Sequence, residues 1–316
     1  MLAAFVQKRH DVPLGQAEQM ILQRQVSVHG NLCVDGYRKL KRGDVVKVHA
    51  FPIAAPLSAD DLKIVFEDRH LLVVDKPAGV TSVREPGMNA RGKRQATLDE
   101  LLARRDKSKG NRGRSQPASR QPTPRQPPAI FPVHRLDRDT SGLMLFAKSR
   151  EAEKMLLERF RHHDIDRAYK AVVIGRPGQR TIESDLVRDR GDGKRGSLPP
   201  GQNARGAQHA ITHVRPAESI GSWSIVECRL ETGRTHQIRI HLSELGHPLC
   251  GDKMYRHADH LKDQSDAPRQ ALHAFRLGLA HPITGRRLKF ESDWPEDLAK
   301  WLEALRRMSK NAQDAR

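Results

Sequence analysis

Residues 133–148 read VHRLDRDTSGLMLFAK, a charged turn followed by an apolar run. Asp, Thr, Ser and Gly favour turns, and the run at 143–148 is typical of a buried strand. The turn carries two carboxylates among three basic side chains: Asp137, Asp139, His134, Arg135 and Arg138. Cations beside a carboxylate favour its ionised form, which a nucleophile requires. The stretch predicts a strand just after a candidate catalytic aspartate, although either carboxylate could instead cap the turn.

Short strands surround this stretch on both sides. Apolar or alternating runs stand at residues 62–66, 70–77, 167–174, 209–214 and 223–230. Helical spacing marks three other segments: 151–160, which Ser149 can cap, 235–245 and 293–305. Because the strands do not alternate strictly with helices, the pattern favours an α+β fold with a mostly antiparallel mixed sheet and flanking helices.

Proline-rich and basic stretches divide the chain. Residues 51–61 carry two prolines and predict a linker between a small domain at 1–50 and a larger one at 62–305. Residues 104–128 hold eight basic residues, one acidic residue and five prolines, which predicts a disordered basic insertion. That insertion could be merely solvated or could contact a nucleic-acid backbone. We expect a Gly- and Arg-rich loop at 188–208 and a basic, frayed tail at 306–316.

Composition narrows the class of protein. The 316 residues include 56 Lys and Arg against 38 Asp and Glu, a net charge of +18. No run approaches the roughly 18 apolar residues of a membrane helix, and the first residues turn polar too soon for a signal peptide. Three widely spaced cysteines, Cys33, Cys228 and Cys250, argue against a disulfide framework. We expect a cytoplasmic protein with no membrane association and with nucleic acid as its partner.

Sixteen histidines raise the question of a metal site. The closest pairs, His162 with His163, His236 with His241 and His257 with His260, lack His-Glu-x-x-His spacing and a nearby thiolate pair. The chain also lacks a Walker loop and a dinucleotide fingerprint. We therefore expect no metal and no cofactor.

The first fifty residues combine one helical stretch with short strands. Leu14, Ala17, Met20 and Ile21 have helical spacing, and alternating residues predict a hairpin over 26–34 and a closing strand over 45–48. Four cations gather before a Gly-Asp turn: Arg38, Lys39, Lys41 and Arg42. This arrangement suits a module that binds a nucleic-acid backbone, or an α+β domain with an ordinary charged face.

Two further segments carry candidate chemistry. In LETGRTHQIRIHLSELGHPLCGD at 230–252, a Thr-Gly-Arg turn leads into a helix, which places Arg234 at a natural anion position. Tyr169 lies in the strand segment 167–174 between two basic residues. Taken alone, Tyr169 could equally be a half-buried strand residue.

Five motifs in one order resemble the RluA-type RNA pseudouridine synthases. They are DKPAGV at 75–80, HRLDRDTSGLMLFAK at 134–148, DRAYKAVV at 166–173, TGRTHQIRIHLSELGHPLCGD at 232–252 and RQALHAFRLGLAHPITGRRLKF at 269–290. The resemblance covers about residues 62–300. The first fifty residues resemble the αL-type RNA-binding module, with VHGNL where that module usually has Val-Asn-Gly.

The resemblance implies isomerisation of uridine in RNA to pseudouridine without a cofactor. The sequence carries no signal for oligomeric state, and a monomer is the default expectation. Asp137 matches the catalytic aspartate, and Tyr169 matches the tyrosine that packs on the uracil. Arg234 matches the arginine that pairs with this aspartate, and Arg135 matches the residue that fills the gap left by a flipped base. The N-terminal module favours large-subunit rRNA over tRNA as the substrate. The 104–128 insertion and TSVREPG at 81–87 depart from the family pattern and bear on which RNA is bound.

Two other functional classes fit parts of the sequence. A non-catalytic RNA-binding or ribosome-assembly protein would explain the charge and the N-terminal module. A nucleosidase or base-removing glycosylase would explain a carboxylate beside a glycosidic bond, but such an enzyme has no need to retain and turn the base.

Overall fold

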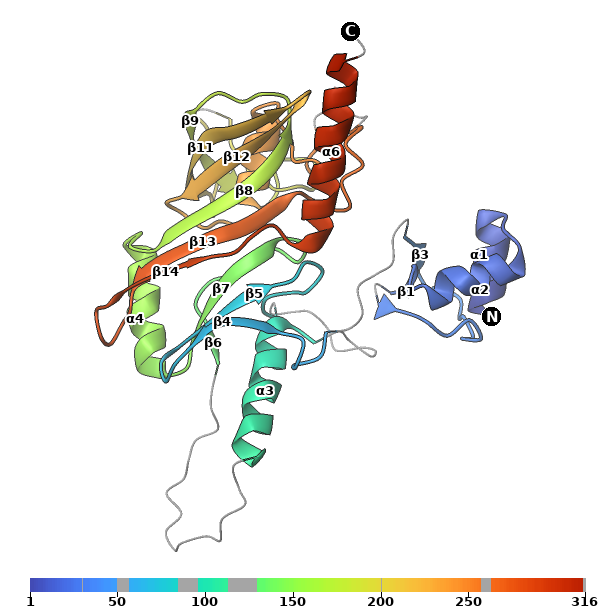
Figure 1. Ribbon diagram of the computed structural model, residues 1–316, viewed down its shortest axis with the longest axis horizontal. Helices are drawn as coiled ribbons and strands as arrows, with labels where there is room; N and C mark the ends of the chain where they lie inside the picture. The colour runs from blue at the N-terminus through green and yellow to red at the C-terminus, as the bar shows by residue number, and fades with distance from the viewer. Residues whose placement is uncertain are drawn as a thin grey trace, which may run out of the picture. The chain divides into compact units, whose positions relative to one another are not determined.

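A computed structural model of the chain describes residues 1–29, 31–49, 57–84, 96–112, 130–199, 201–256 and 263–314. The chain divides into two compact units (Figure 1), one formed by residues 1–61 with 84–97 and one by 62–83 with 98–316. Several positions discussed above lie outside the described residues: Gly30, most of the 51–61 linker, the later part of TSVREPG, 113–128, His257 and His260.

The first unit packs two helices on a small sheet. Its elements are α1 (Leu2–His10), α2 (Leu14–Leu22), β1 (Val26–Val28), β2 (Asn31–Leu32) and β3 (Val46–Val48), with the strands in the order β2-β1-β3. The second helix and the strands were predicted from spacing. The first helix was not, because it buries only Leu2, Ala3 and Val6 and so has a short apolar face.

An 11-stranded sheet forms the body of the second unit. Nine strands follow the order β10-β9-β11-β12-β8-β13-β7-β5-β4, while β14 pairs with β13 and β6 with β7. Of the described strand pairs, β13 and β7 run parallel and the others antiparallel, which confirms the predicted mixed sheet. The strands are β4 (Lys63–Glu67), β5 (Leu71–Lys76), β6 (Phe131–Pro132), β7 (Ser141–Ala147), β8 (Asp166–Ile174), β9 (Arg180–Val187), β10 (Gly196–Ser197), β11 (Gln208–Ile220), β12 (Trp223–Leu230), β13 (Leu272–Ala280) and β14 (Arg287–Glu291).

Four helices flank this sheet: α3 (Leu98–Arg112), α4 (Arg150–Arg161), α5 (Gln237–Glu244) and α6 (Glu296–Asp314). Helix α4 begins at the predicted cap, where Ser149 Oγ accepts a hydrogen bond from Ala152 N, and it buries Ala152 and Leu156 against strands β5, β7 and β13. Helix α6 buries the predicted face of Leu298, Trp301, Leu302 and Leu305. In the described part of the chain, no helix is long and apolar enough to cross a membrane.

Two helices extend further than the composition predicted. Helix α3 continues to Arg112, into the stretch predicted to be disordered. It buries Leu98, Leu101 and Leu102, and Lys and Arg, which follow them, propagate a helix well. Helix α6 continues to Asp314 through most of the predicted frayed tail, and an ion pair between Arg306 and Glu218 of β11 supports this extension. The predicted 188–208 loop also contains the short strand β10.

A glycine lets β7 approach β13 closely. Gly142 has a φ of 115°, and a Cβ atom there would lie 2.3 Å from the carbonyl oxygen of Ala274. Only glycine adopts this conformation readily and leaves this space. The Asp-Thr-Ser-Gly sequence therefore joins the candidate catalytic turn to the centre of the sheet.

The half-buried His134 and the buried His241 and His273 form hydrogen bonds between neighbouring elements as neutral rings. His134 Nε2 accepts a hydrogen bond from Leu145 N at 2.9 Å, so this nitrogen carries no proton. Burial, helped by the nearby Arg167, lowers the pKa of His134 to about 3. Burial likewise lowers the pKa values of His241 and His273 to about 4. Protonation of any of these rings would place a charge in the interior.

We predict that His134 makes the folded state sensitive to mild acid. Between pH 7.5 and 5, His134 binds a proton in the unfolded state but stays neutral in the folded state. The free energy of unfolding therefore falls as the pH falls. The wild type should lose about 2 kcal/mol more over this range than the His134→Gln variant. Urea unfolding at both pH values measures the difference, with His162→Gln at an exposed ring as the control. Equal losses in wild type and His134→Gln would contradict the prediction.

Candidate active site

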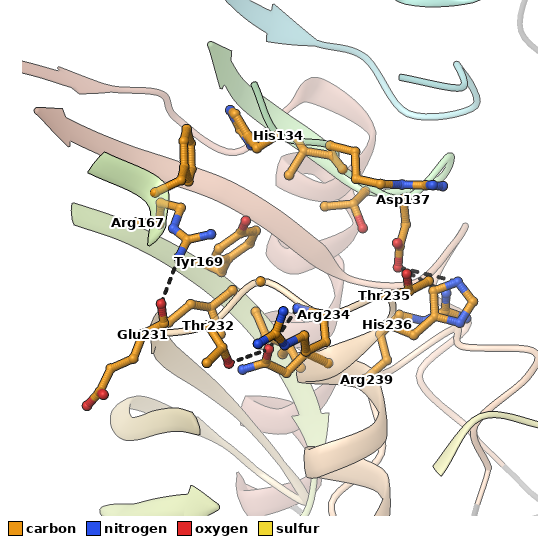
Figure 2. A pocket seen from close by; sticks show the side chains of 18 of the residues that line it. His134, Asp137, Arg167, Tyr169, Glu231, Thr232, Arg234, Thr235, His236 and Arg239 are labelled. Carbon is orange, nitrogen blue, oxygen red and sulfur yellow. Dashed lines mark hydrogen bonds and ion pairs between the residues drawn. The ribbon is translucent and has the colours of Figure 1, made fainter. Parts of the chain in front are cut away.

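A cavity of about 490 Å³ lies in the second unit, where the loop before β7, strand β8 and the start of α5 meet (Figure 2). Four of the eight site residues predicted from the sequence line it: Arg135, Asp137, Tyr169 and Arg234. The loop supplies Asp137, the strand supplies Tyr169, and the turn before the helix supplies Arg234. Three motifs far apart in the sequence thus form one site.

A buried ammonium group anchors the Asp137 loop from beneath. Lys76, at the end of β5, is fully buried and donates hydrogen bonds to the carbonyls of Pro77 (3.0 Å), Val80 (2.9 Å) and Arg138 (2.9 Å). Burial lowers the pKa of Lys76 to about 7, while Asp139 and Asp137 favour its charged form. This lysine links the DKPAGV turn to the residue after Asp137, a role that sequence reasoning missed.

The segment after DKPAGV holds the other side of the same loop. Ser82 Oγ donates to the carbonyl oxygen of Leu136 at 2.7 Å and also lies 3.1 Å from Leu136 N, which donates back to it. Gly79 N donates to the Arg138 carbonyl at 2.8 Å, and Arg138 Nε donates to the Gly79 carbonyl at 3.1 Å. The backbone on both sides of Asp137 is therefore fixed before any substrate arrives.

Arg239 holds the Asp137 side chain. Its Nη1 donates to Asp137 Oδ2 at 3.2 Å, while Nε and Nη2 donate to the two oxygens of Asp252 at 2.6 and 3.0 Å. Asp252 also accepts from the backbone N–H groups of Met254 and Tyr255. Although burial opposes its charge, these bonds lower the pKa of Asp252, so a buried anion balances the buried guanidinium.

Arg234, which was expected from the family resemblance to pair with Asp137, makes a different contact in this structure, and Arg239 bonds to Asp137 instead. Arg234 Nε donates to the carbonyl oxygen of His209 at 2.9 Å, and the side chain is exposed at the mouth of the cavity. Helix α5 begins only at Gln237, which turns Arg239 in its first turn towards Asp137. The sequence signal for Arg239 is a second arginine in the same TGRTHQIR segment, five residues after Arg234.

Gln237 organises the Thr-Gly-Arg turn. Its Oε1 accepts from Thr232 Oγ1 and from Arg234 N, and its Nε2 donates to the Ile211 carbonyl of β11. The preceding His236 has a φ of 61°, a left-handed conformation that is uncommon for a residue other than glycine. This conformation places His236 Nε2 3.8 Å from Asp137 Oδ2 and His236 Nδ1 2.8 Å from the Tyr255 hydroxyl.

Burial favours the uncharged form of two rings near Asp137. Burial lowers the pKa of His236, although the negative charge of Asp137 opposes the change. Burial also raises the pKa of Tyr169, which is 7% exposed and lies in the cavity wall. The Asp137 side chain therefore faces an aromatic surface and accepts a hydrogen bond from the guanidinium of Arg239.

The other four predicted residues belong to the first unit. Arg38, Lys39, Lys41 and Arg42 are exposed on the loop between β2 and β3. The start of α1 holds this loop, because Leu2 N donates to the Arg38 carbonyl and Ala3 N donates to the Gly36 carbonyl, both at 2.9 Å. Tyr37 in the same loop is 74% exposed.

Comparison with known proteins places this site in a family. A sequence model of the RNA pseudouridylate synthase family matches residues 70–244, which include the loop of Asp137, strand β8 and helix α5. The chain belongs to the RNA pseudouridylate synthase family. It is thus an RNA-modifying isomerase, as the five motifs implied.

Named relatives of this synthase share most of its length. It is 39% identical over 257 residues to the ribosomal large subunit pseudouridine synthase D of Zymomonas mobilis, covering 79% of this chain and 74% of that protein. It is 37% identical over 262 residues to the protein of the same name from Pseudomonas aeruginosa, covering 80% and 74%. The solved structure of human RNA pseudouridylate synthase domain containing 4 has the same fold, with a TM-score of 0.59 at 24% identity over 78% of this chain and 95% of that one.

We predict that Arg239 and Arg234 of this synthase differ sharply in importance. Arg239→Met removes the cation that holds Asp137 and should lower the rate of uridine isomerisation about a hundredfold or more. Arg234→Met removes only an exposed contact to the His209 carbonyl and should cost less than about tenfold. Single-turnover assays on one RNA measure both rates. Equal losses, or a larger loss for Arg234→Met, would contradict the assignment.

Proposed function

We propose that this enzyme converts a uridine of large-subunit ribosomal RNA to pseudouridine, with Asp137 as the reactive carboxylate. The observation that carries the proposal is Asp137 itself, held by Arg239 in a cavity that Tyr169 also lines. A cavity of about 490 Å³ is of the size that binds a small ligand such as a nucleoside. We further propose that the enzyme acts as a monomer, because Asp137, Tyr169 and Arg239 of a single chain already line the cavity together.

The reaction needs the target nucleotide outside the RNA helix. Its atoms are inaccessible in a stacked duplex, so the base is extruded into the cavity and packs against Tyr169. Arg135 then fills the gap in the RNA, and its exposed position among the residues that line the cavity supports this role. Asp137 then acts on the nucleoside as nucleophile or base. The bond from N1 to C1′ breaks, a bond from C5 to C1′ forms, and the C5 proton is replaced by one on N1, so the product is an isomer.

The choice of rRNA rests on two observations. The similar proteins named above carry the name ribosomal large subunit pseudouridine synthase D. The first unit adds an exposed basic loop, Arg38 to Arg42, which suits contacts to an RNA backbone. We further propose that the enzyme works in the cytoplasm, where the bacteria that contain the similar proteins named above make their rRNA. A tRNA substrate is the alternative that the mapping below separates.

We predict that pseudouridine mapping of total RNA identifies the target. A deletion strain should lose one or a few pseudouridines in large-subunit rRNA, and wild-type protein should restore them. Asp137→Asn protein, made at equal level, should restore none, because an amide can neither attack nor accept a proton as a carboxylate does. Restoration by Asp137→Asn would refute a catalytic role for this residue. Pseudouridines lost from tRNA alone would refute the rRNA assignment, and released uracil would indicate a glycosylase.

We predict that the loop of the first unit contributes to affinity and not to chemistry. The variant Arg38→Ala/Lys39→Ala/Lys41→Ala/Arg42→Ala should bind rRNA more weakly, with a shallower salt dependence, by about 0.7 to 0.9 in log–log slope for each phosphate that the loop no longer neutralises. The single-turnover rate at saturating enzyme should stay the same. Lys8→Ala/Arg9→Ala/Lys47→Ala removes exposed cations elsewhere in this unit and is the control. An equal change of slope in both variants would mean that bulk charge alone explains the binding.

A further inference from the structure

A second cation, Arg167, stands in the cavity wall. It lies on β8 two residues before Tyr169 and is 8% exposed. Its Nη2 donates to the carbonyl oxygen of Glu231 at 3.0 Å, and its Cζ lies 5.2 Å from the centre of the Phe160 ring. Among the described residues, no carboxylate pairs with this guanidinium and its buried Nε has no hydrogen-bond partner.

This arrangement is costly if Arg167 has only a structural role. A buried cation requires an anion or a full set of acceptors, and burial lowers the pKa of Arg167 accordingly. One carbonyl and one aromatic ring satisfy only part of that requirement. An uncharged side chain of similar length would fill the same volume without the penalty. Arg239, in the same wall, shows the contrast, because the buried Asp252 balances its charge and Asp137 accepts a further hydrogen bond from it.

The position of Arg167 indicates which group could accept its remaining hydrogen bonds. Residues two apart on a strand point to the same face, so Arg167 and Tyr169 face the cavity together. Figure 2 shows the Tyr169 ring between the Arg167 guanidinium and the Asp137 carboxylate. Both of these charges act on the Tyr169 hydroxyl. A nucleoside whose ribose lies at Asp137 and whose base lies on Tyr169 would present the far edge of that base to Arg167.

The Thr-Gly-Arg turn leaves room for this guanidinium. A Cβ atom on Gly233 would lie 2.7 Å from Arg167 Nη1, closer than two such atoms can approach. The glycine therefore allows Nη1 to remain at the cavity wall, where no hydrogen bond to a described residue occupies it.

We propose that Arg167 is a further catalytic residue, which donates a hydrogen bond to a carbonyl oxygen of the target uracil and stabilises the charge on the base as it leaves the ribose. This inference rests on the proposed function. When the bond from N1 to C1′ breaks, its electron pair stays on the uracil and is shared with O2 and O4. The guanidinium keeps its proton throughout, and the electron pair forms the new bond when C5 attacks C1′. Because the charge exists only during the reaction, the contact raises the rate more than the affinity for RNA.

Sulfur substitution in the substrate tests the contact. Single-turnover rates are measured on an RNA that carries uridine, 2-thiouridine or 4-thiouridine at the target site, because sulfur is a weaker acceptor than oxygen. The ratio of the oxygen rate to the sulfur rate is compared between enzymes, so that the intrinsic effect of sulfur cancels. Arg167→Met should react about a hundredfold more slowly with uridine, at an RNA affinity within about twofold of wild type. For either 2-thiouridine or 4-thiouridine, the ratio of the oxygen rate to the sulfur rate should be about tenfold smaller in Arg167→Met than in the wild type.

Two further variants make the result decisive. Arg167→Lys keeps a buried cation and should recover part of the rate. Its oxygen-to-sulfur rate ratio should lie between those of the wild type and Arg167→Met. Arg176→Met is the matched control, because Arg176 also donates to a backbone carbonyl, that of Gly221, but lies outside the cavity. Its rate and ratio should equal those of the wild type.

The contact is refuted if a folded Arg167→Met enzyme keeps a rate within about threefold of wild type, or if its ratio at both positions equals the wild-type ratio. If Arg167→Met does not fold, the same criterion of an unchanged ratio applies to Arg167→Lys. Failure of the proposed function is separate, because it would appear as a wild-type enzyme that makes no pseudouridine from unmodified uridine, or as full activity in Asp137→Asn.

Discussion

One guanidinium, shared between two carboxylates, determines the geometry of this site. Arg239 gives two of its donors to Asp252 and one to Asp137. The buried Asp252 already balances the positive charge of Arg239. Asp137 is therefore held in position by a single hydrogen bond, and its other oxygen is not bonded to Arg239. The loop before β7, helix α5 and the segment that follows it all meet at this side chain, so the position of Asp137 depends on the packing of the whole second unit.

The sheet explains why this loop can be rigid as well as exposed. Lys76 and Ser82 bind the carbonyls on either side of Asp137, and Gly142 joins the end of the loop to the parallel contact between β7 and β13. A carboxylate held in this way would need little rearrangement when a substrate arrives. The aromatic wall of Tyr169 lies on β8, whose neighbours on both sides are strands of the same sheet. The groups that would bind the base and attack the sugar are therefore carried by one rigid body.

The sequence predicted the parts of the site that depend on local chemistry. Asp137 lies in a turn that its own neighbours specify, and Tyr169 lies in a regular strand, so ordered motifs were sufficient to find both. The choice between Arg234 and Arg239 depends on where helix α5 begins, and that is set by a left-handed histidine that spacing does not reveal. Lys76 was missed because its burial depends on carbonyls from two separate segments. The predicted ends of helices α3 and α6 came too early, because the charged residues at these ends have the composition of a solvated tail.

The most direct test of the central claim is a structure of the Asp137→Asn variant bound to an RNA that contains its target uridine. The account predicts that this uridine is flipped out of the RNA helix, with its ribose C1′ against the side chain at position 137 and its base on the Tyr169 ring. It also predicts that Arg239 still bridges position 137 and Asp252. A target uridine that remains stacked, or that binds away from this cavity, would contradict the account.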